Sequence, residues 1–116
     1  MAHYEDLTID QGTDVSIDVY LVTKTGAVKD LTGYTVAGKL ATSYDAVDSD
    51  KIAFTSLVAS PATDGIVNLA LTNAQTESLN PKKRYVYDVE LSQDSDGTTT
   101  VERVLQGLIT VSPSVT

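Results

Sequence analysis

Five aspartates in two polar segments are the residues best suited to bind a cation or share a proton. Asp45, Asp48 and Asp50 lie in one segment, and Asp94 and Asp96 lie in another. Calcium loops place about six to eight oxygen ligands around the ion and are commonly closed by a glutamate. Neither segment has that glutamate, and the spacing in the first is irregular. Solvated turn aspartates account for both, so the sequence predicts no metal site and no paired-carboxylate catalysis.

Nucleophilic catalysis would require a serine, threonine or cysteine beside an oriented base. The chain has no cysteine, and its one histidine, His3, lies near the N-terminus, where a side chain is commonly mobile. The glycines at 26, 33 and 38 are spaced for turns and do not form a phosphate-binding loop between a strand and a helix. The sequence therefore predicts neither catalytic nor cofactor-binding residues, and a protein that is not an enzyme.

Bulk properties exclude further classes of partner. With 116 residues and a net charge of −8, the chain would be repelled by phosphate backbones, which argues against nucleic acid. No apolar run approaches the ~20 residues of a membrane-spanning helix, and residues 1–6 lack the basic and apolar regions of a signal peptide. We therefore expect one domain over 1–116, no membrane partner, and synthesis in a host cytoplasm without export by the general route.

The elements that would position any site are strands. Apolar residues alternate with polar ones over 15–21 and again over 85–91, which is typical of half-buried strands. Breaks rich in Gly, Asp and Pro separate such runs, notably 30–33 and 60–65. The pattern predicts seven or eight short strands, joined by tight turns into a single antiparallel β-sandwich with an all-β fold.

Three local features refine this prediction. Thr72 and Gln75 have the spacing of a capping box, so a short helical turn is expected near residues 73–79, before Asn80-Pro81. Hairpin turns are expected at 24–27 and 93–98. Gly38, inside a strand pattern, indicates a bulge or a close approach of another backbone.

Apolar residues on predicted outer faces suggest a contact surface. Tyr20 and Val22 interrupt the polar side of one strand, and Val104 and Leu108 do the same on the last strand. An outward apolar patch on such a domain usually marks a protein contact, so these four residues are the predicted protein interface. The alternative is that a bulge at Gly107 reverses the phase of the strand and turns Leu108 into the core.

Several segments together are similar to a known family. They are Gln11–Asp14, Asp30–Val36, Asp64–Val67, Leu71–Thr72, Tyr85–Leu91 and Arg103–Pro113. They resemble the small Ig-like modules of tailed-phage virions, and most nearly the N-terminal domain of upper baseplate proteins from phages of Gram-positive hosts. The resemblance implies an Ig-like fold and brings no catalytic or metal residues. Those proteins continue into a receptor-binding or connecting region, whereas this sequence ends at Thr116, so a stand-alone subunit is expected.

The resemblance implies a non-enzymatic structural component of a tailed-phage virion. It would serve as a tail, baseplate or neck accessory or as a capsid decoration, docking on other virion proteins as a symmetric oligomer. The alternative is a carbohydrate-binding or adhesin-like β-sandwich module, in which Tyr20, Tyr34 and Tyr44 could provide rings on which sugars stack.

Overall fold

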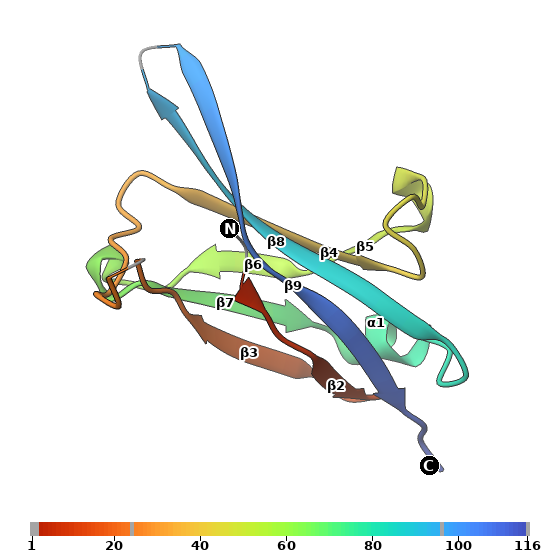
Figure 1. Cartoon of the computed structure of the whole chain (residues 1–116). Coiled ribbons are helices and arrows are strands. Elements are labelled where there is room, and N and C mark those ends of the chain that lie inside the picture. Colours follow the sequence, from red (N-terminus) through yellow and green to blue (C-terminus); the bar gives the residue numbers. More distant parts are fainter. Residues whose placement is uncertain (1–2, 24, 96, 116) are drawn as a thin grey trace.

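The computed structural model describes residues 3–23, 25–95 and 97–115, and it contains two stacked β-sheets (Figure 1). The larger, sheet A, has the strand order β1-β9-β8-β4-β5, and β2 also pairs with β9. Its strands are β1 (His3–Tyr4), β2 (Leu7–Asp10), β4 (Thr35–Ala41), β5 (Ile52–Ala53), β8 (Arg84–Ser95) and β9 (Thr98–Ser112). The smaller, sheet B, consists of β3 (Val15–Tyr20), β7 (Ile66–Leu71) and β6 (Thr55–Val58), in that order. The all-β sandwich predicted from the sequence is confirmed.

One hydrophobic core fills the space between the sheets, and the predicted alternation supplies it. From sheet B, Val67, Leu69 and Leu71 point inward, with Val15 and Val19 of β3 packed against them. The inner face of sheet A contributes a larger set, which includes Leu40, Tyr85, Tyr87, Val89, Leu91, Leu105, Ile109 and Val111. Each fully buried side chain of this kind stabilises the fold by about 1.5–3 kcal/mol.

Sheet pairing is antiparallel except at the N-terminus. Both β1 and β2 run parallel to β9, with Leu7 beside Ile109 and Ile9 beside Val111. Tight turns join antiparallel neighbours, whereas parallel neighbours need a long connection. Here nearly the whole chain forms that connection. The alternation within each strand carries no information about such a distant partner, so it did not predict this pairing.

The chain between β1 and β2 lies against the inner face of β9. The Glu5 amide donates to the Gln106 carbonyl at 2.9 Å, and the Tyr87 hydroxyl donates to the Glu5 carbonyl at 2.6 Å. Burial raises the pKa of the Tyr87 phenol, and the Glu5 and Asp6 carboxylates raise it further. The hydroxyl therefore keeps its proton over the ordinary pH range and remains a donor to this segment.

A tyrosine near the start of β8 fastens the connection that precedes it. The Tyr85 hydroxyl accepts a hydrogen bond from the Asn80 amide at 2.8 Å, and the Tyr85 ring is buried. Such a bond from a tyrosine back to the preceding corner is a hallmark of immunoglobulin-type sandwiches. Together with the two-sheet topology, it makes this sandwich Ig-like.

The predicted helical turn is present as α1 (Asn73–Glu77). The Gln75 amide donates to the Thr72 hydroxyl at 3.3 Å, and the Thr72 amide donates to the Gln75 side-chain oxygen at 2.9 Å. This reciprocal pair is the capping box that the sequence spacing predicts. Two 3₁₀ turns, η1 (Asp48–Asp50) and η2 (Ala62–Asp64), occupy other connections.

A bulge in β9 changes which of its residues face the core. Val89 of β8 is opposite Leu105, but the next residue, Glu90, is opposite Arg103, so Val104 is the extra residue. Beyond the bulge, Leu105, Gly107, Ile109 and Val111 face inward. The alternative bulge at Gly107, which would have turned Leu108 into the core, is wrong, since the phase changes three residues earlier.

The two predicted hairpins differ in length: the first is short, and the second is a long two-stranded arm. At the first, the Thr23 amide donates to Ala27 and Val22 bridges to Val28, although Lys24 lies outside the described residues. At the second, β8 and β9 extend past the sandwich as a two-stranded arm that rises at the top of Figure 1. The tip residue Asp96 is likewise outside the described residues.

The turn at 30–33 offers a direct pH test. The Asp30 carboxylate accepts from the Thr32 hydroxyl at 2.6 Å and from the Thr32 amide at 2.9 Å. Both bonds lower the pKa of Asp30 below its ordinary value of 3.8, and the bond from the hydroxyl has the larger effect. The bonds therefore favour the folded state above pH 3.8, and this contribution disappears as the pH falls through the lowered pKa. In Thr32→Val we expect the pKa of Asp30 to move up toward 3.8, as measured by carboxyl ¹³C NMR titration; an unchanged value would contradict the assignment.

Candidate protein-docking site

Three of the four predicted interface residues line one groove. The groove lies on the flank where the β3 edge of sheet B faces β9 of sheet A, and it has a volume of about 380 Å³. We call it the flank groove; its lining includes Glu5, Tyr20, Val22, Lys29, Glu102 and Val104. The structure thus brings Tyr20, Val22 and Val104 together, although they come from opposite ends of the chain.

The rim of the flank groove is apolar and exposed on the β3 side. Tyr20 is 71% exposed and Val22 is 59% exposed. Val28, which bridges to Val22 across the hairpin, is 58% exposed and extends the same surface. Clustered exposed apolar side chains of this kind usually mark an interaction site. We refer to Tyr20, Val22 and Val28 as the rim patch.

The strand that borders the groove has a free edge. Among the described strands, β3 pairs only with β7, so one side of its backbone has no strand partner. Sheet proteins commonly block unwanted pairing at an edge with charged side chains, prolines or bulges. The six residues Val15–Tyr20 contain one charged side chain, Asp18, and no proline, lysine or bulge. A further strand could therefore add to sheet B at β3.

Charged groups span the groove behind the rim patch. The Lys29 ammonium lies 3.5 Å from the Glu102 carboxylate of β9 and also sits over the Tyr34 ring, 5.6 Å from its centre. The backbone of Lys29 is held in place because its amide donates to the Leu21 carbonyl at 3.1 Å. Such partly exposed pairs contribute about 0–1 kcal/mol to stability. The ion pair links Lys29, which follows the hairpin, to β9 across the groove.

Val104 and Leu108 do not form the exposed interface that the sequence predicted for them. Val104 is only 9% exposed and belongs to the core cluster, because the bulge turns it into the floor of the groove. Leu108 lies on the outer face of sheet A opposite Val86, half-buried and away from the flank groove. Its amide donates to the Asp6 carboxylate at 3.2 Å. The prediction that Val104 lies on an outer face is therefore wrong, and Leu108 is not part of this site.

The aspartate segments have structural partners. Asp48 pairs with Lys51 at 3.4 Å within the loop that holds η1, and Asp94 accepts from the Thr99 hydroxyl at 2.6 Å. Within the described parts of the chain, no three His, Cys, Asp or Glu side chains converge to hold a metal ion. His3 begins β1, where it is beside Leu105.

The three tyrosines considered as sugar platforms do not share a face. Tyr20 points outward from sheet B, whereas Tyr34 is half-buried against the core. Tyr44 lies over the outer face of sheet A, near Asp88 and Arg103. Sequence position alone could not separate them, because their faces depend on the pairing of distant strands.

The fold and the site define the class of protein as an Ig-like β-sandwich with an open sheet edge. A comparison with models of known protein families found no match, and neither did a search of the curated proteins. In the described part of the chain, no helix is both long and apolar enough to cross a membrane.

Proposed function

We propose that this protein is a non-enzymatic structural component of a tailed-phage virion and docks on neighbouring virion proteins through the flank groove. The observation that carries the proposal is the free edge of β3 beside the exposed rim patch. A partner strand paired with β3 would gain main-chain hydrogen bonds, and the rim patch would bury apolar area at the same contact. The family resemblance of the strand and turn segments supports the choice of a phage particle.

The mode of action is adhesion by a rigid subunit. Each copy presents the same β3 edge and the same rim patch, so identical copies on a symmetric particle would make the same contact repeatedly. The chain would be made in the host cytoplasm and work in the virion. A tail, baseplate or neck accessory and a capsid decoration are equally compatible with this mode of docking.

Particle incorporation tests the proposal. In Tyr20→Asp/Val22→Asp, two exposed side chains become charged at the rim, and we expect incorporation into purified particles to fall about tenfold or more. The measurement is quantitative mass spectrometry of particles from a phage whose genome encodes the chain, with circular dichroism to show that the variant folds.

Leu57→Asp is the matched control. Leu57 is 50% exposed on β6, the opposite edge of sheet B, so incorporation should stay at the wild-type level. If the wild-type chain is absent from such particles, the virion role is wrong. If the rim variant is incorporated as well as the wild type, docking through the flank groove is wrong.

A further inference from the structure

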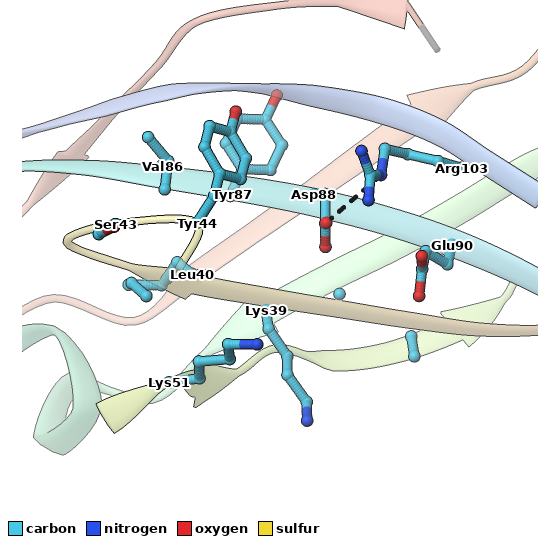
Figure 2. Close-up of a pocket in the computed structure, with 13 residues that line it drawn as sticks. Lys39, Leu40, Ser43, Tyr44, Lys51, Val86, Tyr87, Asp88, Glu90 and Arg103 are labelled. Atoms are coloured by element: carbon cyan, nitrogen blue, oxygen red, sulfur yellow. Dashed lines mark ion pairs between the residues drawn. The ribbon is translucent and has the colours of Figure 1, made fainter. Parts of the chain in front are cut away.

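A second hollow lies on the outer face of sheet A, away from the flank groove. It has a volume of about 420 Å³, within the range of small-ligand sites. Its floor is formed by β4 and β8, and the loop that follows β4 carries Tyr44 and Lys51 beside it (Figure 2). We call it the outer-face groove, lined among others by Lys39, Tyr44, Asp88, Glu90 and Arg103.

Strand register extends this surface toward the N-terminal edge of the sheet. Lys39 of β4 is opposite Asp88 of β8, Asp88 is opposite Gln106 of β9, and Gln106 is beside Tyr4 of β1. Paired residues share a face, so these four side chains form one row across the sheet. Three strand spacings make the row about 14 Å long.

Two tyrosine rings are available on this face. Tyr4 is 56% exposed and Tyr44 is 52% exposed. Partial burial raises the pKa of the Tyr44 phenol, the Tyr4 phenol and the Asp88 carboxylate raise it further, and Arg103 opposes them. Exposed rings that stand beside a groove provide flat apolar surfaces against which a ligand can stack.

The ratio of basic to acidic residues is higher in the groove than in the chain as a whole. The chain has 8 basic and 16 acidic residues, whereas the groove lining has three basic residues, Lys39, Lys51 and Arg103, and two acidic ones, Asp88 and Glu90. Asp88 and Arg103 lie 3.5 Å apart, and Figure 2 shows them meeting above β8. Among the ion pairs between described residues, neither Lys39 nor Glu90 takes part in one. Donors and acceptors are therefore interspersed in the groove, and Lys39 and Glu90 lie beyond ion-pair distance of their cross-strand neighbours Asp88 and Arg103.

We propose that the outer-face groove binds an oligosaccharide. Sugar rings present apolar faces that stack on tyrosine, and their hydroxyl groups both donate and accept hydrogen bonds. Tyr4 and Tyr44 provide the stacking surfaces, Asp88 and Glu90 accept from hydroxyls, and Lys39 and Arg103 donate to them. A simple anion would be repelled by the carboxylates of Asp88 and Glu90. An apolar peptide would leave the charged groups of the groove without hydrogen-bond partners.

This site is independent of the proposed docking function. The flank groove lies between β3 and β9, whereas the outer-face groove lies over β4 and β8, so one copy could dock on a particle and bind a glycan at once. A protein fixed to a particle in many copies would gain avidity from weak individual sites.

The test is an NMR titration of the ¹⁵N-labelled chain with glycan hexamers. The probes are chito-oligosaccharide, cello-oligosaccharide and oligogalacturonate, so neutral, N-acetylated and acidic chains are all represented. We expect saturable shifts for at least one probe at the amides of Lys39, Tyr44, Asp88 and Arg103. In Tyr44→Ala the affinity should fall about tenfold.

Tyr20→Ala is the matched control, because Tyr20 is an exposed tyrosine on the other sheet and should leave glycan affinity unchanged. Equal losses in Tyr20→Ala and Tyr44→Ala would overturn the proposed location. Inorganic phosphate that reproduces the same saturable shifts would replace the glycan with an anion and overturn the ligand class. Absence of saturable shifts with all three hexamers up to about 10 mM would overturn the proposal. Tyr44→Ala should be incorporated into particles at the wild-type level, because Tyr44 does not line the flank groove.

Discussion

Replacing Gly107 with alanine is expected to destabilise the protein by about 3–5 kcal/mol. A methyl group at this inward-facing position would overlap the Glu5 carbonyl oxygen and lie 3.2 Å from the Tyr87 ring. Neither neighbour can move freely, since the Glu5 carbonyl accepts the Tyr87 hydrogen bond and the Glu5 amide is bonded to Gln106. The segment between β1 and β2 must therefore leave the sheet, and the buried Tyr87 hydroxyl loses its acceptor. Urea denaturation followed by circular dichroism measures the loss.

Gly26→Ala separates this effect from the general cost of removing a glycine. Gly26 has φ of +86° but no atom within 4 Å of the position an added Cβ would occupy, so only backbone strain of about 1–2 kcal/mol is expected. If Gly107→Ala costs no more than Gly26→Ala, the close packing of the N-terminal segment against β9 is incorrect.

Replacing Phe54 with alanine is expected to cost about 3–5 kcal/mol. Phe54 stands where the chain leaves β5 of sheet A and enters β6 of sheet B, and it is only 5% exposed. Its ring meets Tyr87 edge to face, with centres 6.3 Å apart, and its amide donates to the Gly38 carbonyl at 2.9 Å. Removing the ring leaves a cavity at the crossing between sheets, which rigid strands cannot fill. Thermal and urea unfolding both report this cost.

A double-mutant cycle with Gly38→Ala tests the contact itself. A Cβ at Gly38 would lie 3.2 Å from Cδ2 of Phe54, closer than ordinary packing. Gly38→Ala should therefore destabilise the wild type but cost about 1 kcal/mol less when Phe54 is already alanine. Additive effects would show that the two residues do not crowd each other. Leu57→Ala, on the exposed side of β6, should change stability by no more than about 0.5 kcal/mol.

Gly38 shows what a glycine within a strand leaves open. It indicated a bulge or a close approach of another backbone, whereas the structure has regular pairing along β4, and the Phe54 ring is the group nearest to an added Cβ, at 3.2 Å. Residues 52–59 have a strand-like sequence, but they form two strands in different sheets, β5 and β6. The sequence did not reveal this crossing. A buried apolar residue at position 54 fits the strand pattern whether or not the chain changes sheets there.

The two grooves are proposed to serve different contacts, one with a protein and one with a ligand. The flank groove depends on a free strand edge and an apolar rim, and the outer-face groove depends on tyrosine rings and paired charges. Variants at Tyr20 and Tyr44 address them separately, so particle incorporation and glycan affinity should respond to different substitutions.

Short-range chemistry in the chain decided the parts of this fold that neighbouring residues can specify. Alternation over 15–21 and 85–91 specified the strands, and Thr72 with Gln75 specified the start of α1. The same local information showed that Tyr20 would point outward. Side-chain direction along a strand has a period of two, and a capping box spans four residues, so no distant segment is needed.

Pairing between distant segments decided the rest. Parallel pairing of β2 with β9 and the bulge that buries Val104 both depend on which strands meet and in which register. The row from Tyr4 to Lys39 likewise exists only after β1, β9, β8 and β4 have paired. A shift of one residue in register reverses the face of every side chain on a strand. Only the tertiary structure could therefore place Val104 in the core and bring Tyr4 and Tyr44 to one face.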